Sequence, residues 1–219
     1  KEKYEFRLFV DDAHGFGTIG KKGAGVGEEQ NCIDGIDIYF STFAKSMASI
    51  GGFIAGDPKI LKYMRYNMRS QIFAKSMPLP LVLGNMKRLE MIIKHPEFKE
   101  KLWHTVRRLQ SGLKEKGFDI GKTNTPVTPV FLHGDLTLHE TTQLIFDLRE
   151  NYHIFCSVVL YPIVPKGIIM LRLIPTAVHT DEDIDLTLKA FTDVRAKLEA
   201  KQYPATFPPA LMKAEVPVG

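Results

Sequence analysis

Side chains able to do chemistry follow two strands that the sequence predicts. Asp11 and His14 come directly after a predicted strand at residues 4–10, and Lys45 follows a second predicted strand at residues 36–42. Catalytic groups of α/β proteins gather at the carboxyl ends of strands. An acid, an imidazole and an amine at such strand ends are the groups that an aldehyde cofactor bound to a lysine requires. Each residue alone has a simpler interpretation, namely an Asx-turn aspartate, a surface histidine and a solvated lysine, so the hypothesis depends on the combination.

A glycine-rich stretch lies between these groups. Residues 15–20 (Gly-Phe-Gly-Thr-Ile-Gly) match the dinucleotide-binding pattern GxGxxG. That function requires the glycines to open a helix whose N-terminus holds a pyrophosphate. Residues 21–27 are rich in lysine and glycine and predict no such helix. We therefore reject a dinucleotide site and interpret residues 15–27 as a loop shaped by glycine.

Composition narrows the class of protein. The 219 residues are 44% hydrophobic and 25% charged, with a net charge of +4, which is typical of a soluble globular protein and excludes a disordered or collagen-like chain. The excess of lysine and arginine over acidic residues is not gathered in one segment, so it does not favour nucleic-acid binding. Cys32 and Cys156 have no metal-ligand spacing, so we expect reduced thiols, no metal and a cytoplasmic location. The longest apolar stretch, residues 154–164, contains Pro162 and is about half a membrane span, so we expect no stable membrane insertion.

The hydrophobic pattern predicts an α/β protein in two parts. The first part contains strands at residues 4–10, 36–42 and 50–55, followed by a helix that Asp57 and Pro58 open. That helix continues to about residue 70. In the second part, predicted helices alternate with predicted strands. Its predicted helices cover residues 79–94, 96–116, 138–151 and 181–200, and its predicted strands cover residues 127–132, 154–160 and 168–174.

Four linked motifs resemble those of the α-oxoamine synthases. They are residues 9–15 (FVDDAHG), 20–25 (GKKGAG), 42–46 (TFAKS) and 51–56 (GGFIAG), and the similarity continues through residues 171–173 and 176–180. That family uses pyridoxal 5'-phosphate (PLP) to condense an amino acid with an acyl-CoA, and it releases carbon dioxide. The resemblance implies a fold-type I PLP-dependent transferase, and this chain is similar to its C-terminal half.

The same resemblance implies how the chain is organised. Residues 1–80 would complete the PLP-binding large domain, residues 81–202 would form the small C-terminal α/β domain, and residues 203–219 would be a proline-rich tail. The family's glycine-rich phosphate loop and its ring-stacking residue are not found in this sequence. We therefore expect residues 1–219 alone to be inactive, and we expect a homodimer with a shared active site.

The resemblance also implies roles for single residues around the cofactor ring. Lys45 would bind the cofactor aldehyde through its amine, which burial and a nearby cation help to deprotonate. Asp11 would pair with the pyridine nitrogen and keep it protonated, so that the ring accepts electrons. His14 would hydrogen-bond the ring oxygen, and Ala13 would lie flat against one ring face.

Other residues would bind the phosphate and the substrate. Thr42 and Ser76 would contact the cofactor phosphate, although Ala44 and Ala74 replace serines that many family members have there. Arg172 matches the arginine that binds the amino acid's carboxylate, a task suited to the forked guanidinium group. Without the motif, Arg172 would be interpreted as a strand-end arginine in a salt bridge.

Within the family, residues 42–53 are most similar to bacterial serine palmitoyltransferases. This similarity implies condensation of L-serine with palmitoyl-CoA to give 3-ketodihydrosphingosine, CoA and carbon dioxide, a step of sphingolipid synthesis. The alternatives are an 8-amino-7-oxononanoate synthase of biotin synthesis and a 2-amino-3-ketobutyrate CoA ligase. An aminotransferase of the same fold and an inactive fragment also remain open.

Overall fold

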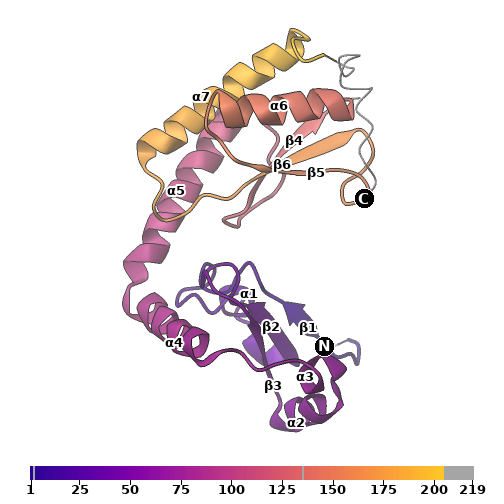
Figure 1. The fold of residues 1–219 in the computed structure, drawn as a ribbon, viewed down its shortest axis with the longest axis vertical. Coiled ribbons are helices and arrows are strands. Elements are labelled where there is room, and N and C mark those ends of the chain that lie inside the picture. The colour runs from indigo at the N-terminus through magenta and orange to yellow at the C-terminus, as the bar shows by residue number, and fades with distance from the viewer. Residues whose placement is uncertain (2, 135, 205–219) are drawn as a thin grey trace. The chain divides into compact units, whose positions relative to one another are not determined.

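A computed structural model describes residues 1, 3–134 and 136–204 of the chain (Figure 1). The described residues form two compact units, and the second unit begins at Leu102. Each unit contains a three-stranded sheet and helices. The mixed content agrees with the predicted α/β class, and each unit is described by itself below.

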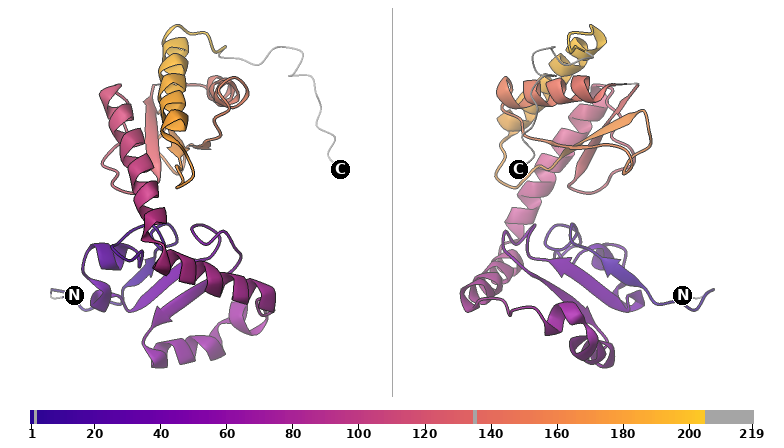
Figure 2. Two further views of the ribbon diagram at one scale, coloured as in Figure 1. Left: turned by 90° about the vertical axis from the view of Figure 1, so that its left-hand side faces the viewer. Right: turned by 45° about the vertical axis from the view of Figure 1, so that its right-hand side comes forward.

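The first unit is built on a sheet in the order β1-β2-β3. β1 (Phe9–Asp11) runs parallel to β2 (Ile38–Thr42), and β3 (Gly52–Gly56) runs antiparallel to β2. Figure 2 shows the three strands side by side, with α2 close to β3. β1 is shorter than the buried strand predicted at residues 4–10, and Tyr4 is 76% exposed. The difference arises because only Phe9 to Asp11 pair with β2, so the preceding apolar residues have no ladder to join in the described sheet.

Short helices complete the first unit. α1 (Val26–Glu29) lies at the end of the predicted glycine loop, and a 3-10 turn follows at Ile33–Gly35. The helix predicted from Asp57 to about residue 70 is divided into α2 (Pro58–Asn67) and α3 (Arg69–Ile72). Met68 interrupts it with an extended backbone conformation. Its predicted start is observed, because the Asp57 carboxylate accepts a hydrogen bond from the Lys59 N–H at 2.7 Å.

The boundary near residue 80 between the family's large and small domains stays a prediction. The two compact units meet between Lys101 and Leu102, inside α5 (Pro96–Glu115). α4 (Leu79–Lys94) therefore belongs to the first unit. Side-chain contacts explain this assignment, because Asn85 Nδ2 reaches Met77 Sδ at 3.4 Å. Lys99 Nζ also donates to the Gly20 carbonyl of the glycine loop.

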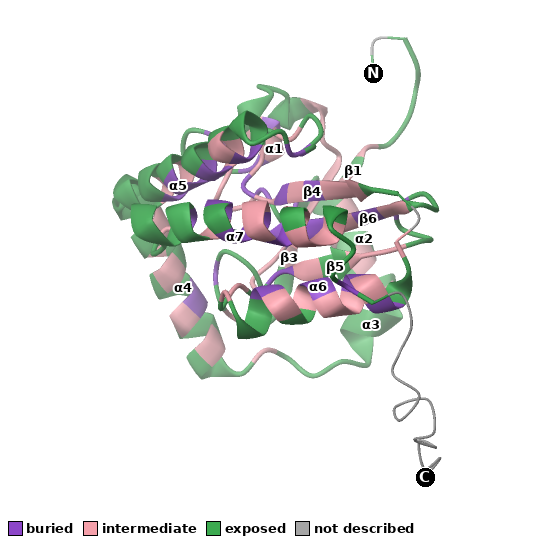
Figure 3. Ribbon diagram, turned by 90° about the horizontal axis from the view of Figure 1, so that it is seen from above, coloured by how far each residue is buried: buried purple, intermediate pink, exposed green. Residues whose placement is uncertain are grey.

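The second unit contains an antiparallel sheet in the order β4-β6-β5. The strands are β4 (Thr128–His133), β5 (Ser157–Val159) and β6 (Ile168–Leu173), and α6 (Leu138–Glu150) and α7 (Asp181–Glu199) accompany them. Figure 3 shows buried positions recurring along α6 and α7 between exposed ones. Alternate β6 side chains enter the core, as the pleat of a strand requires. The core includes Leu109, Leu113, Val130, Leu144, Leu148, Leu171, Leu188 and Phe191.

Capping residues mark the end of α5 and the start of α7. Gly117 has a φ of 75°, the left-handed conformation that favours glycine after a helix. Thr180 and Asp183 form a capping box at the start of α7. The predicted tail at residues 203–219 lies mostly outside the described residues. Its first residue, Tyr203, is buried and donates to Asp147 Oδ2 at 2.6 Å. No described helix is both long and apolar enough to cross a membrane.

Candidate active site

The strands β1 and β2 place two functional loops at one edge of the first sheet. They are parallel, and Asp11 pairs in register with Phe40. The ladder continues for one bond beyond β1, because the Asp12 N–H donates to the Phe40 carbonyl at 2.9 Å. Both strands therefore point their carboxyl ends in the same direction, and the loops that follow them carry His14 and Lys45.

Asp11 stands at the exposed end of β1. Its Oδ1 accepts a hydrogen bond from the Ala13 N–H at 3.0 Å, which is the Asx turn considered from the sequence. In the described part of the chain, its other oxygen, Oδ2, takes no protein hydrogen bond. The turn thus orients the carboxylate and leaves one oxygen for a ligand. Ala13 is only 8% exposed, so little space surrounds its methyl group.

His14 lies in a tight turn that begins at Asp12. The Gly15 and Phe16 amides both donate to the Asp12 carbonyl at 3.1 Å. The His14 carbonyl accepts from Thr18 Oγ1 at 2.7 Å, and the side chain is exposed. Its backbone is therefore fixed on both sides, while the imidazole faces outward.

Lys45 lies in the hairpin loop that joins β2 to β3. The loop is closed by hydrogen bonds from the Phe43 N–H to the Gly51 carbonyl at 2.9 Å and from the Ser49 N–H to the Phe43 carbonyl at 2.8 Å. Met47 is 1% exposed and anchors the loop in the first unit, whereas Lys45 is exposed. A fixed backbone thus presents the amine to solvent, so the burial that was expected to help deprotonate Lys45 is not observed among the described residues.

A direct contact joins the two loops. Ser46 Oγ donates to the Phe16 carbonyl at 2.6 Å. The Phe16 ring also meets the Phe53 ring of β3 edge-on at 5.1 Å. Because Ser46 follows Lys45 and Phe16 lies two residues after His14, this contact brings the predicted amine, imidazole and acid to one region of the first unit.

The two residues predicted to bind phosphate are arranged differently. Thr42 Oγ1 donates to the Gly51 carbonyl at 2.9 Å and accepts from the Ala44 N–H at 3.1 Å. Its proton is therefore used to close the Lys45 loop, so a phosphate contact requires this hydroxyl to turn. Ser76 is exposed, and its neighbour Met77 packs against Gly51. The phosphate role of both residues stays a prediction.

Arg172 belongs to the second unit. It lies on β6 between the buried Leu171 and Leu173, so it faces away from the core of that unit. Its Nε donates to Ser157 Oγ at 3.4 Å. This partner is a hydroxyl and not the carboxylate that a structural salt bridge would need. The guanidinium charge thus has no carboxylate partner among the described residues, and its substrate role stays a prediction.

The sequence interpretation missed Asp12, which is 7% exposed. Asp12 Oδ2 accepts from the Val26 N–H at 2.7 Å and from Tyr39 Oη at 2.9 Å. Burial and the neighbouring Asp12 carboxylate raise the pKa of Tyr39 well above its ordinary value, so the phenol remains a donor. The sequence did contain a signal for a buried Asp12. Adjacent side chains of a strand point to opposite faces of the sheet, so one of two adjacent acids at a strand end must turn inward.

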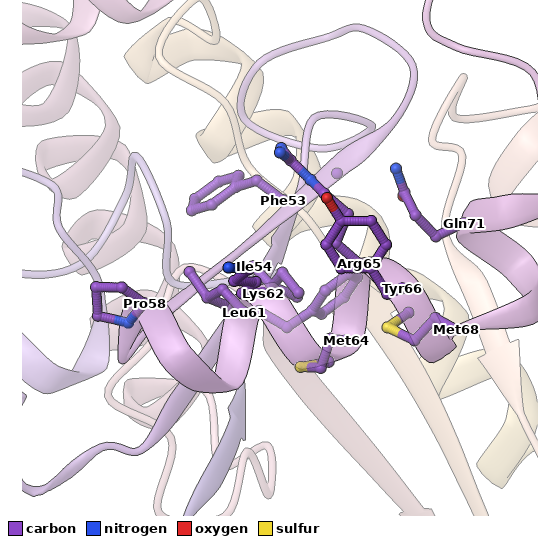
Figure 4. A pocket seen from close by; sticks show the side chains of 12 residues that line it. Phe53, Ile54, Pro58, Leu61, Lys62, Met64, Arg65, Tyr66, Met68 and Gln71 are labelled. Atoms are coloured by element: carbon purple, nitrogen blue, oxygen red, sulfur yellow. The ribbon is translucent and has the colours of Figure 1, made fainter.

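One cavity of the first unit lies away from these loops. It has a volume of about 820 Å³ and is lined by Phe40 of β2, by β3 and α2, and by residues that follow α2. Figure 4 shows side chains such as Phe53, Leu61, Tyr66 and Gln71 around it. Neither strand-end loop contributes to this lining. Within the described ranges, no group of three or more histidine, cysteine or acidic residues is placed to hold a metal ion.

Comparisons with known proteins agree with this geometry. Residues 1–191 match the family model described as aminotransferase class I and II. The chain is 60% identical over 205 residues to a cysteate-C-fatty acyltransferase of Capnocytophaga ochracea, covering 94% of this chain and 48% of that protein. It is 35% identical over 198 residues to a serine palmitoyltransferase of Sphingobacterium spiritivorum, covering 90% of this chain and 49% of that protein.

A solved structure of SPT with PLP shares the fold. It superposes with a TM-score of 0.80 and 27% identity, covering 88% of this chain and 48% of that chain. The match confirms the predicted fold class. The chain spans about half the length of these relatives. Its placement in their C-terminal half stays the prediction made from the motifs.

Proposed function

Because the chain belongs to the aminotransferase class I and II family, and within it to the α-oxoamine synthases, we propose that it forms part of a PLP-dependent acyltransferase. The proposed reaction joins the α-carbon of an amino acid to the carbonyl carbon of an acyl-CoA. The bond to the amino acid's carboxylate breaks and releases carbon dioxide, and the thioester bond breaks and releases CoA. The observation that carries this proposal is the contact between the Ser46 and Phe16 loops, which gathers Lys45, His14 and Asp11.

The donor set of these loops fits PLP chemically. Lys45 offers an exposed amine for an aldehyde, and Asp11 offers an oriented carboxylate with one oxygen left for a protonated ring nitrogen. His14 offers an imidazole for the ring oxygen, and Ala13 offers a small surface that does not obstruct a flat ring. The set thus matches an aldehyde-bearing pyridine and has no arrangement suited to a metal.

When bound, PLP supplies an aldehyde for the substrate nitrogen and a ring that accepts carbanion electrons. Lys45 Nζ holds the cofactor until the amino acid arrives. The Asp11 carboxylate keeps the proton on the ring nitrogen, which preserves the electron-accepting character of the ring. Arg172 is proposed to bind the substrate carboxylate through its guanidinium fork.

We propose L-cysteate as the amino acid. The support is the 60% identity to a cysteate-C-fatty acyltransferase, against 35% to a serine palmitoyltransferase. Cysteate carries a sulfonate where serine carries a hydroxyl, so the two substrates differ by one full negative charge. L-Serine, which the motif at residues 42–53 favoured, is the second candidate.

The test is a substrate comparison with protein produced from the complete gene. Palmitoyl-CoA or pimeloyl-CoA is supplied with L-cysteate, L-serine, L-alanine or glycine, and the CoA thiol and carbon dioxide released are both measured. The proposal expects kcat/KM for cysteate to exceed that for serine at least about tenfold, a difference of about 1.4 kcal/mol in transition-state binding.

Other outcomes assign other activities. Preference for serine indicates a serine palmitoyltransferase, and preference for alanine with pimeloyl-CoA indicates an oxononanoate synthase. Formation of a 2-oxo acid without CoA release indicates an aminotransferase and refutes the proposed reaction. Sedimentation of the same preparation tests the proposed homodimer.

A further inference from the structure

We propose that Asp12 is a positioning residue of this site, which fixes the turn carrying Asp11 and His14 without contacting the cofactor itself. The inference rests on the proposed PLP chemistry, but its structural part concerns this chain alone. Asp11 and Asp12 are adjacent and chemically identical, yet the first is exposed and the second is buried. Burial therefore separates a ligand-facing acid from a structural one.

The Asp12 carboxylate ties three segments together. Its Oδ2 accepts from the Val26 N–H at the start of α1 and from Tyr39 Oη on β2. The first bond closes the glycine loop back onto the end of β1, across fourteen residues of sequence. Hydrogen bonds to a charged acceptor are stronger than neutral ones, and a buried donor left without its acceptor is costly.

The backbone of Asp12 also forms hydrogen bonds on both sides of the residue. Its N–H donates to Phe40, and its carbonyl accepts from the amides of Gly15 and Phe16. The peptide on either side of Asp12 is therefore held, and with it the Ala13 N–H that orients the Asp11 carboxylate. A shift of the Asp12 side chain would be transmitted to Asp11 through this short turn.

Two glycines enclose the carboxylate so closely that no side chain fits beside it. A Cβ on Gly15 would lie 2.1 Å from Asp12 Oδ1, and a Cβ on Gly25 would lie 1.8 Å from Asp12 Oδ2. Gly25 also has a φ of 93°, so its substitution strains the backbone as well. Gly15 has no such backbone requirement, which makes Gly15→Ala a steric probe that displaces the carboxylate without removing its charge.

Glu28 provides a matched control. Its carboxylate ties the same glycine loop through the amides of Lys22 and Ala24, at 3.0 Å each. Neither bond involves Asp11 or Asp12 themselves. Glu28→Gln therefore weakens the glycine loop while the Asp12 carboxylate stays in place, and it separates positioning by Asp12 from general loop rigidity.

The experiment compares Asp12→Asn, Gly15→Ala and Glu28→Gln in protein from the complete gene. Without PLP, amide hydrogen exchange is measured at Val26 and Ala13. With PLP, the pH midpoint of the visible absorption band and the kcat and KM for the amino acid are measured. We expect Asp12→Asn to speed exchange at Val26 and to lower kcat by about tenfold or more, with KM changed less than about threefold.

The other variants decide the interpretation. Gly15→Ala should shift the pH midpoint in the same direction as Asp12→Asn, and the double variant should be no worse than the more severe single one. Glu28→Gln should leave the midpoint unchanged. The proposal is overturned if Glu28→Gln matches Asp12→Asn, or if Asp12→Asn alters neither exchange nor midpoint. Wild-type protein that binds no PLP overturns the proposed function instead, and the exchange data still decide whether Asp12 holds the turn.

Discussion

Replacing Met47 by alanine is expected to loosen the Lys45 loop from within. Met47 is 1% exposed, whereas the other side chains of residues 43–51 are exposed or half-buried. It is therefore the single buried anchor of this loop, and it lies two residues from the amine. Ser46 also binds the Phe16 carbonyl, and the Phe43 ring stacks on Phe53 at 5.5 Å, but among residues 43–51 only the Met47 side chain is fully buried in the first unit.

The structure sets the magnitude of the effect. Removing a buried methionine side chain costs about 2–5 kcal/mol, and the cost depends on how far the site can collapse. A hairpin loop with solvent on one side can relax, so we expect the lower part of that range, about 2–3 kcal/mol. With a urea slope of about 1–3 kcal/mol per molar, the unfolding midpoint should fall by about 0.7–3 M.

Met47→Leu is the control, because leucine keeps the volume and should cost less than about 1.5 kcal/mol. Urea unfolding of cofactor-free protein is followed by circular dichroism, and PLP binding is then titrated by absorbance. Met47→Ala should lower both stability and PLP affinity, while Met47→Leu should keep both near wild type. Equal stability of the two variants would refute the anchoring argument. Lost stability with unchanged PLP affinity would show that the anchor does not position Lys45.

Lys45→Ala should abolish the visible absorption band of bound PLP and the release of CoA; an unchanged spectrum would contradict the assignment. Asp11→Asn should lower kcat by about 100-fold or more with a smaller loss of PLP occupancy, since asparagine cannot hold the pyridinium charge; turnover within a few-fold of wild type would point to another acid. Arg172→Lys should raise the amino-acid KM by about tenfold and spare the acyl-CoA KM, because lysine has no fork. Thr180→Ala should cost about 1 kcal/mol of stability in urea unfolding. Hydrogen bonds from Thr180 also lower the pKa of Asp183, so the Asp183 carboxylate makes its own contribution to stability, present above the ordinary carboxyl pKa and lost as pH falls through the folded value.

Most helices could be predicted because their signals are local. The apolar period and the prolines of residues 79–116 predicted α4 and α5 to within a residue of their observed bounds. Thr180 and Asp183 likewise marked the start of α7. Such features depend on neighbours within a turn or two, and a sequence shows those neighbours directly.

The first and last residues of the strands were harder to predict, because they depend on pairing with other strands that lie far away in the sequence. Residues 4–8 are apolar enough for a strand, yet β1 begins at Phe9, where pairing with β2 begins. The helix predicted to residue 70 breaks at Met68, where nothing in the sequence forbids a helix. For this break we have no physical account beyond the observed extended conformation.

The candidate site shows the same division between local and long-range information. The motifs identified Lys45, Asp11 and His14, and β1–β2 pairing explains why their loops share an edge. The Ser46–Phe16 contact joins residues thirty positions apart, and no local pattern indicates it. For Thr42 the resemblance implied a phosphate contact, and the structure adds that its hydroxyl closes the Lys45 loop; the phosphate role stays a prediction.

The pair Asp11 and Asp12 shows why residue type alone does not decide a catalytic role. Either carboxylate could hold a pyridinium proton, and the sequence places them one residue apart. Asp12 is enclosed by Gly15 and Gly25 and already accepts from two donors, so a ring could reach it only by breaking those bonds. Asp11 lies outside that enclosure with one oxygen free of protein hydrogen bonds in the described chain. We therefore expect Asp11, the acid that the fold leaves accessible, to serve the ligand, and we expect its buried neighbour to determine the position of Asp11.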